Sequence, residues 1–330
     1  MKRIMKSFAC VAVLAFMALA VMPDSRAAEY PTGNITVVIP YGPGGGSDLG
    51  TRIITNSMSK YLGVSFVPVY KPGAGTTIAV KYFMGRKPDG YTLLSGAVDV
   101  SVNFYPKIVK GADYGVGAMT PLFGYAEVPM VLVVKADAPW KTFKEFMADV
   151  KKNPNKYKHG SYGATSLSHF CMALINQKAG TETKHVPFAS TGKALTALLG
   201  GHVDIVAATS LGGGMYKAGK IRALAVALEE RTDLLSGVPT LKELGYDVTM
   251  ALHYAMWAVN GTPKEIQNKL IGAAKKAFTK DRQALVKDFG NIEMTAKFAD
   301  QKTYEKIIKE RDKQFDYIIN LLKVPTYHKK

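Results

Sequence analysis

The sequence predicts an α/β protein built from two halves, and three observations support this prediction. Short runs rich in β-branched residues alternate with amphipathic helical patterns along most of the chain. Such alternation is typical of parallel sheets with helices on both faces. Two similar glycine- and serine-rich junctions, at 40–48 and 159–169, each lead into a helical pattern. The length of 330 residues suits two domains of ordinary size once a leader is removed.

The predicted elements alternate in this way as far as Gly261. Strand-like runs occur at 35–39, 66–70, 91–95, 131–135, 185–188, 204–208 and 223–228. Helical patterns lie between them at 48–61, 77–86, 143–152, 166–178 and 193–199. Later patterns are helical, at 263–279, 281–289 and 303–322, and Pro263 fits the first position of a helix that follows Thr262. Segments 125–129 and 252–261 are expected to cross between the halves.

An export signal is predicted at the N-terminus. Three basic residues precede an apolar run at 8–22, and Ser25-Arg26-Ala27 offers small residues at the −3 and −1 cleavage positions. This pattern predicts a secretory signal peptide of residues 1–27. A membrane anchor is the alternative, but the run is shorter than the roughly 20 residues that a membrane span needs. The sequence therefore predicts export to a bacterial periplasm.

The basic composition favours an anionic partner. The formal net charge is +17, and residues 1–27 hold four basic residues and one acidic residue, so about +14 remains after cleavage. Nucleic acid is disfavoured because the chain carries an export signal. Its lysines are also scattered along helical patterns rather than interleaved with aromatic residues. We expect most of them to form a solvated surface.

The segment 35–48 carries the strongest functional signal. A β-branched run ends at Pro40, and Tyr41-Gly-Pro-Gly-Gly-Gly-Ser-Asp48 follows before a helical pattern. Glycines let a ligand approach the main chain, and a helix N-terminus adds about half a positive charge. A strand, a bare loop and a capped helix start together predict capture of a carboxylate or phosphate. Asp48 is expected either to contact the ligand or to cap its own helix.

The junction at 159–169 repeats this arrangement, with glycine, serine and threonine just before a helical pattern. Two such loops on two α/β halves predict a cleft with one loop on each side. His169 lies three residues after Ser166 and is expected either to face this cleft or to pack on its helix and bond the loop backbone.

Enzyme and cofactor motifs fit poorly. A G-x-G-x-x-G match that begins at Gly42 or Gly44 fails, because Ser47 and Leu49 stand at the sixth positions. The sequence contains no phosphate-binding P-loop, no G-x-S-x-G and no His-Glu-x-x-His motif. Its six histidines show no metal-ligand spacing, and Cys171, alone outside the signal peptide, is expected in the core. We therefore expect no cofactor and no metal.

A family resemblance emerges from the order and spacing of many short motifs. They are Pro-Tyr-Gly-Pro-Gly-Gly-Gly-Ser-Asp at 40–48, Arg52, Lys-Pro-Gly-Ala-Gly at 71–75, Pro-Asp-Gly-Tyr-Thr-Leu-Leu at 88–94, Gly160-Ser161 through His169, His-Val-Pro-Phe at 185–188, Gly-Gly-His-Val-Asp at 200–204, 218–226, Val-Pro-Thr at 238–240 and Gly-Thr-Pro at 261–263. With these motifs the chain resembles the periplasmic solute-binding proteins of tripartite tricarboxylate transporters, often called Bug proteins. The similarity covers essentially the whole mature chain.

The resemblance implies a two-lobed periplasmic-binding fold of type II, a Venus flytrap that closes over a small carboxylate. Lobe 1 would comprise 28–126 with 256–330, and lobe 2 would comprise 127–255. The ligand-binding positions implied are Tyr41, Gly44, Gly45, Gly46, Ser47, Asp48, Ala74 and Gly75 in lobe 1 and Ser161, Thr165, Ser166 and Asp204 in lobe 2. Backbone amides of the lobe 1 loops would hold one carboxyl group, partly through ordered water.

Departures from the family pattern predict a retuned pocket. Family members often carry glycine where Thr165 stands, tyrosine at Phe188, and a basic residue followed by glycine at Ala189-Ser190. Phe188 removes a phenol donor, whereas Thr165 and Ser190 add hydroxyl groups to the candidate site.

Three functions fit these observations. A monomeric binding protein would deliver a small organic anion to membrane permease subunits without catalysing a reaction. A ligand sensor of the same fold would signal to a receptor. A secreted hydrolase would use His169 or Cys171 with Ser161.

Overall fold

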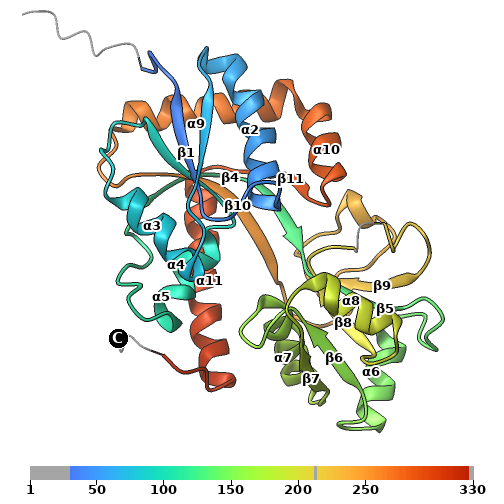
Figure 1. Ribbon diagram of the computed structural model, residues 1–330. Helices are drawn as coiled ribbons and strands as arrows, with labels where there is room; N and C mark the ends of the chain where they lie inside the picture. Colours follow the sequence, from blue (N-terminus) through green and yellow to red (C-terminus); the bar gives the residue numbers. More distant parts are fainter. Residues whose placement is uncertain (1–29, 212–213, 327–330) are drawn as a thin grey trace, which may run out of the picture.

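The computed structural model describes residues 30–211 and 214–326 of the chain as two α/β halves (Figure 1). The predicted signal peptide, residues 1–27, lies outside the described residues. Among the described residues, no helix is long and apolar enough to span a membrane.

The first half contains a six-stranded sheet in the order β11-β4-β10-β3-β1-β2. Its strands are β1 (Ile35–Ile39), β2 (Phe66–Tyr70), β3 (Thr92–Gly96), β4 (Thr120–Pro129), β10 (Ala251–Ala258) and β11 (Thr295–Ala299). β1 pairs in parallel with β2 and β3, whereas β10 is antiparallel to β3 and β4, and β11 is antiparallel to β4. The helical elements of this half are α2 (Gly46–Leu62), η1 (Ala74–Thr76), α3 (Thr77–Met84), α4 (Asp99–Asn103), α5 (Tyr105–Ile108), α9 (Lys264–Lys280), α10 (Arg282–Asn291) and α11 (Gln301–Leu321).

The second half contains a five-stranded sheet in the order β7-β6-β8-β5-β9. Its strands are β5 (Val131–Lys135), β6 (Lys158–Ser161), β7 (Lys184–Pro187), β8 (Ile205–Ala208) and β9 (Ile221–Val226). β6 is parallel to β7 and β8, and β5 is antiparallel to β8 and β9. The helical elements of this half are α6 (Phe143–Lys152), α7 (Leu167–Ala179), α8 (Thr191–Leu199) and η2 (Asp233–Leu235). Both sheets are therefore mixed: β10 and β11 run antiparallel to the other strands of the first sheet, and β5 runs antiparallel to the other strands of the second.

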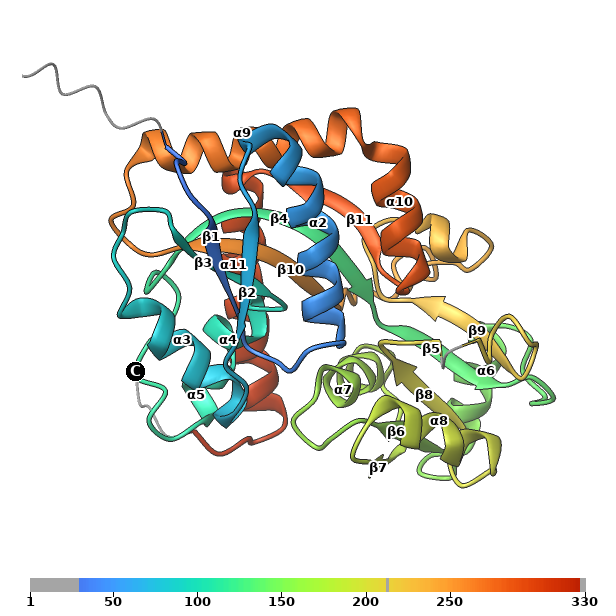
Figure 2. The same cartoon turned by 45° about the horizontal axis from the view of Figure 1, so that its top comes forward.

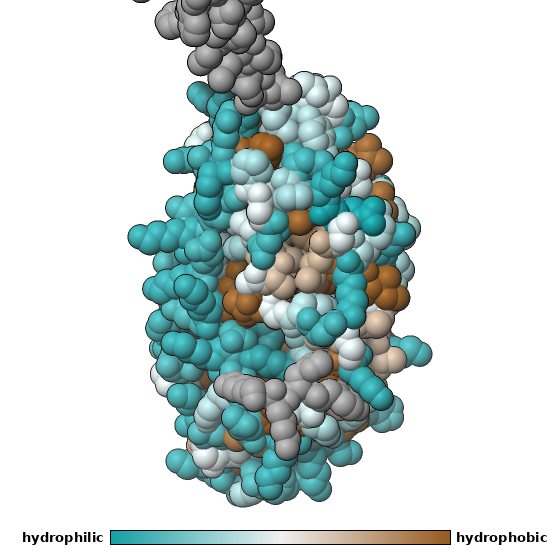
Figure 3. Space-filling model, turned by 90° about the vertical axis from the view of Figure 1, so that its left-hand side faces the viewer, coloured by the Kyte–Doolittle hydropathy of each residue, from teal (hydrophilic) through white to brown (hydrophobic). Residues whose placement is uncertain are grey.

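The central strands are buried on both faces, as strands between two helical layers are. Because side chains alternate along a strand, neighbouring residues of β1 enter different cores. Ile39 contacts a cluster that includes Ile54 of α2 and Leu270 of α9. Val38 belongs to the opposite cluster, with Phe83 of α3. The side of the molecule that carries α3 and α5 is mostly hydrophilic, with small scattered hydrophobic patches (Figure 3).

The chain crosses between the halves where β4 leads into β5 and where the segment after β9 returns to β10 (Figures 1 and 2). Hydrogen bonds from Ala227 N–H to Met130 O and from Met250 N–H to Ala227 O join the crossing segments. The predicted lobe boundaries at 126/127 and 255/256 fall within β4 and β10, which belong to the first sheet as far as Pro129 and from Ala251 onward.

An aromatic cluster also ties the halves together. Phe104, between α4 and α5, lies 5.1 Å from Phe170 of α7 and 5.1 Å from Phe315 of α11, measured between ring centroids. The ring centroids of Phe315 and Phe170 lie 6.5 Å apart, so helix α11 packs on the second half as well as the first.

Most predicted elements are present, with shifts at their ends. The strands at 35–39, 66–70 and 131–135 match β1, β2 and β5, whereas the predicted crossings at 125–129 and 252–261 lie largely in β4 and β10. Pro263 is not the first helical residue, because its ψ of 141° is extended and α9 begins at Lys264. Helix α2 begins two residues before the predicted start, so Ser47 and Asp48 lie in its first turn.

The turn before β3 packs closely against Ile266 and Tyr30, and a substitution at Gly90 in this turn tests that contact. Gly90 has a φ of +80°, and a β-carbon there would overlap Ile266 and approach the Tyr30 ring to 2.9 Å. Gly63 has a φ of +71° without any described atom within 4 Å of such a β-carbon. Both Gly→Ala changes should cost about 1–2 kcal/mol of backbone strain, and overlap should add about 1–3 kcal/mol at Gly90 alone. Urea denaturation should show a lower midpoint for Gly90→Ala than for Gly63→Ala, and equal midpoints would contradict the packing.

Candidate functional site

The first of the two loops predicted to bind an anion, residues 40–48 (the first anion loop), joins β1 to the first turn of α2. Gly45 is the N-cap of this helix, and no side chain within residues 30–211 or 214–326 caps it. The first N–H groups of a helix have no intrahelical partners, and the helix dipole adds partial positive charge there. The end of α2 that carries this turn points toward α7 (Figures 1 and 2). The turn can therefore donate hydrogen bonds to an anion.

Asp48 holds this loop in place rather than acting as the N-cap. Its carboxylate accepts hydrogen bonds from Gly44 N–H at 2.9 Å, Tyr70 OH at 2.9 Å and Arg52 Nε at 2.8 Å. Burial acts to raise the pKa of Asp48, but these hydrogen bonds outweigh it and hold the pKa below its ordinary value. Asp48 is therefore an ionised carboxylate that fixes Gly44, and its direct contact with a ligand stays a prediction.

Another loop of lobe 1, residues 73–76, has an unusual backbone. Gly73, Ala74, Gly75 and Thr76 all have positive φ, at 121°, 46°, 56° and 70°. Positive φ is costly for alanine and threonine, and such strain concentrates at ligand sites. A β-carbon at Gly75 would lie 3.4 Å from the ring of Tyr105, a residue that lines the cavity described below.

The second anion loop joins β6 to α7. Ser166 is the N-cap of α7, where its Oγ accepts from His169 N–H at 3.3 Å and donates to Gly163 O at 2.6 Å. Ser161 is fully buried. Its Oγ donates to Gly163 O at 2.9 Å and lies 2.7 Å from Nε2 of His185. Ser161 thus holds the loop through its bond to Gly163, and Ser166 ends the loop as the N-cap of α7.

The two anion loops meet at a cavity of about 370 Å³ between the halves. The predicted residues that line it are Tyr41, Gly45, Gly46, Ser47, Thr165 and Ser166. The other described residues that line it are Ala97, Val100, Phe104, Tyr105, Tyr162, Leu167, Thr209, Leu252 and Tyr254. The aromatic side chains of this wall, Phe104, Tyr105, Tyr162 and Tyr254, were not predicted from the sequence, although Tyr162 stands inside the second predicted junction.

The described lining of the cavity is uncharged, since it contains no lysine, arginine, aspartate or glutamate, and its polar groups lie among apolar side chains such as Val100, Phe104 and Leu252. Its donors are main-chain N–H groups and the hydroxyl groups of serine, threonine and tyrosine. Burial raises the pKa of Tyr162, so its hydroxyl stays neutral and able to donate. Gly46 lies close to Tyr254, because a β-carbon there would be 3.0 Å from the Tyr254 hydroxyl.

The remaining predicted residues lie outside the cavity lining: Gly44, Asp48, Ala74, Gly75, Ser161, His169, Ser190 and Asp204. Ser190 caps α8 and accepts from Lys193 N–H at 3.2 Å. Asp204 accepts from Lys158 N–H at 2.7 Å. His169 bonds Ala164 O through Nδ1, at 2.5 Å. Each of these three satisfies a backbone group, and any role in ligand binding stays a prediction.

A second cavity, of about 350 Å³, lies between helix α11 and the strands β4 and β10, near the points where the chain crosses between the halves. Its lining includes the carboxylates of Glu127, Glu229 and Glu310. Lys297 Nζ contacts Glu127 Oε1 at 3.1 Å, and Arg311 donates to Ala251 O. The lining thus has three carboxylates against two cations, and both cations already bond to protein oxygens, so the interlobe cavity is the better anion site.

Two α/β halves that enclose a cavity between helix N-termini define the class of two-lobed solute-binding proteins. Residues 51–324 match the family described as the tripartite tricarboxylate transporter family receptor. The chain is 33% identical over 319 residues to the UPF0065 protein in the gbd 5′ region of Cupriavidus necator, covering 94% of both chains.

Solved structures agree with this assignment. A TctC solute-binding protein from Polaromonas, solved without ligand, matches with a TM-score of 0.78 and 29% identity, over 88% of this chain and 99% of that one. MatC from Rhodopseudomonas palustris, solved with bound malate, matches with a TM-score of 0.65 and 26% identity, over 88% of this chain and 100% of that one. The chain belongs to the tripartite tricarboxylate transporter receptor family, which confirms the resemblance and the fold class predicted from the sequence.

The Asp48 network predicts a pH-dependent stability difference. Asp48→Asn should destabilise the protein near pH 7, because the amide loses the charged bond to Arg52. The pKa of Asp48 is lower in the folded state than in the unfolded state. Its contribution is therefore present above the unfolded value of about 3.9 and is lost as pH falls through the folded value. The difference in denaturation midpoint between variant and parent should shrink from about pH 7 to about pH 3.

Asp137→Asn is the matched control, because its ion pair with Lys135, at 3.0 Å, is exposed and should contribute little. If Asp48→Asn unfolds like the parent near pH 7, or if its deficit grows on acidification, Asp48 does not hold the loop in the way described.

Proposed function

We propose that this protein is a periplasmic solute-binding protein that captures a small carboxylate in the interlobe cavity. It would deliver the carboxylate to the permease subunits of a tripartite tricarboxylate-type transporter. The observation that carries the proposal is the uncharged cavity at which the N-termini of α2 and α7 meet. The export signal and the family membership support the periplasmic location.

The chemistry of the lining suits an anion of this size. Neutral donors can hold a carboxylate without a buried cation, because hydrogen bonds to an ionised acceptor are about twice as strong as neutral ones. A volume of about 370 Å³ falls in the range of small-molecule sites, roughly 300–1,000 Å³. The malate bound in the related MatC structure supports a carboxylate as the ligand class.

We propose that no reaction accompanies binding. Ser161 lies next to His185, but it is fully buried and bonds the loop backbone at Gly163. Cys171 is buried inside α7, and burial raises the pKa of its thiol to about 12. A thiol of this kind stays protonated near neutral pH and is a poor nucleophile. These contacts make a structural role the better explanation of the residues that a hydrolase would need.

The proposal is tested by thermal unfolding of the purified mature protein with a panel of mono-, di- and tricarboxylates, aromatic acids included. A ligand at 100 times its dissociation constant should stabilise the protein by about 2.7 kcal/mol. At least one carboxylate should raise the unfolding temperature, while matched alcohols and amines should not. A panel without any effective carboxylate would contradict the proposal.

Gly45→Val tests the main-chain site directly. Gly45 lines the cavity at a negative φ of −83°, so a side chain is tolerated by the backbone but fills the ligand space. Gly42→Val is the control, since Gly42 lies in the same loop, outside the cavity lining, with no described atom within 4 Å of a β-carbon. Isothermal titration with the carboxylate found above should show binding weakened more than about tenfold by Gly45→Val, the loss of more than one neutral hydrogen bond. Equal binding by both variants would remove this loop from the site.

A further inference from the structure

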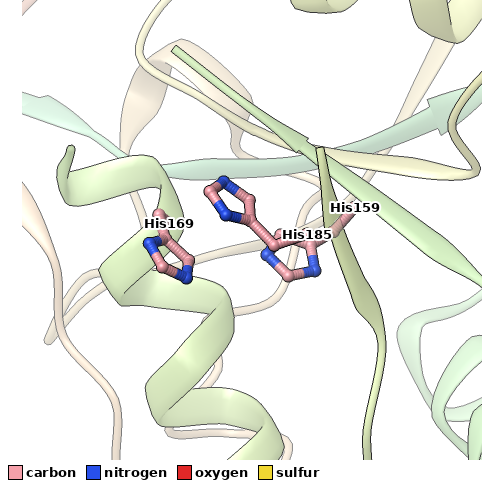
Figure 4. Close-up of side chains that lie close together, drawn as sticks. All are labelled: His159, His169 and His185. Atoms are coloured by element: carbon pink, nitrogen blue, oxygen red, sulfur yellow. The ribbon is translucent and has the colours of Figure 1, made fainter. Parts of the chain in front are cut away.

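Three histidines that are far apart in the sequence come together beside the second anion loop. His159 lies on β6, His185 on the neighbouring strand β7, and His169 in the first turn of α7 (Figure 4). One ring nitrogen from each of the three lies within 4.8 Å of the other two. No metal was predicted from the linear spacing of the histidines. The parallel pairing of β6 and β7, which that spacing does not show, places His159 directly beside His185.

Each ring has one nitrogen held by an oxygen atom, which resembles the supporting contacts of metal-ligating histidines. Nδ1 of His159 lies 2.8 Å from Thr183 Oγ1, and Nδ1 of His169 lies 2.5 Å from Ala164 O. Nε2 of His185 lies 2.7 Å from Ser161 Oγ.

These contacts fix two of the tautomers. A carbonyl oxygen can only accept, so His169 carries its proton on Nδ1 and keeps a lone pair on Nε2. Ser161 donates its own proton to Gly163 O, so His185 donates from Nε2 and keeps a lone pair on Nδ1. These two tautomers leave Nε2 of His169 and Nδ1 of His185 unprotonated and able to bind a cation.

A buried polar atom points to a missing partner in this cluster. His159 is 2% exposed, and its Nε2 has no hydrogen-bond partner among the described residues. Leaving such a buried polar atom unpaired is destabilising. A histidine ring binds a metal in its neutral form, through the nitrogen that keeps a lone pair.

From this arrangement we infer that His159, His169 and His185 form a binding site for a borderline divalent cation of the zinc class. Zinc accepts three imidazole ligands at 2.0–2.1 Å and leaves its fourth position to water or an anion, and other metals that favour imidazole include copper and nickel. The unpaired, buried Nε2 of His159 supports a bound cation independently of how the three rings are grouped. The site is separate from the interlobe cavity, whose described lining contains none of these histidines.

Loading this site requires a ring to turn. His169 and His185 stack with their ring centroids 3.7 Å apart and their planes at 4°, whereas a metal must lie near the plane of each ligating ring. His169 is the ring best placed to turn, because it is partly exposed and, among the described residues, one hydrogen bond holds its ring, to the loop carbonyl of Ala164. Three nitrogens within 4.8 Å must also close to about 3.4 Å, the separation in a tetrahedral site. The cation would then hold β6, β7 and the start of α7 together.

The test uses tag-free mature protein and the metal alone, so its outcome does not depend on any organic ligand. Titration with Co²⁺, a spectroscopic substitute for Zn²⁺, should produce one equivalent of bound metal with intense visible absorption of a tetrahedral site, and Zn²⁺ should displace it. His159→Gln should weaken metal binding at least about 100-fold, because loss of a supporting contact alone costs 10–100-fold. His202→Gln, an exposed histidine of the same half, should bind metal like the parent.

His169→Gln provides a second variant for the case that the buried His159 change impairs folding, with circular dichroism as the check on both. Metal binding that is absent from the parent, or that is unchanged in both cluster variants, would overturn the inference. Loss of binding in His202→Gln instead would place the metal on the surface and overturn it as well.

Discussion

The first turn of a helix leaves main-chain N–H groups without intrahelical partners, and the candidate site depends on where the fold places two such turns. Helix α2 begins at Gly46 in the first half, and α7 begins at Leu167 in the second. Both turns reach the same cavity. An anion between them would receive partial positive charge from both lobes, which neither lobe could supply alone. This dependence on two turns explains why an uncharged cavity can serve an anionic ligand.

Charged and titratable side chains near the cavity hold the loops rather than the proposed ligand. Asp48 fixes Gly44 in the first loop, and its partner Arg52 extends to Tyr70 on β2. In the second loop, Ser161 links the backbone at Gly163 to the histidine stack. A rigid, preorganised loop lowers the cost of ordering donors around a ligand. A cation on the three histidines would act on this same loop, so metal binding and solute binding are expected to influence each other.

Much of the fold and part of the site could be predicted from the sequence, and the remainder depends on tertiary contacts. Buried β-branched runs such as 35–39 predicted their strands because hydrophobic periodicity is a local signal. Strand β4 was expected only as a crossing, since its glycine and two prolines weaken that signal. Glycine-rich junctions identified both helix starts at the cavity. The aromatic wall and the histidine cluster were missed, because residues such as Tyr254, His159 and His185 meet only after the strands pair.

The central claim is that main-chain donors of one lobe and hydroxyl donors of the other hold a single carboxylate in the interlobe cavity. A crystal structure of the mature protein with a bound carboxylate tests it most directly. We expect a carboxyl group within hydrogen-bond distance, or one water, of the N–H groups at Gly45 to Ser47, with Thr165 or Ser166 closing over it from the second lobe. A carboxylate held instead by Lys297 or Arg311, in the cavity beside α11, would rule out this binding mode.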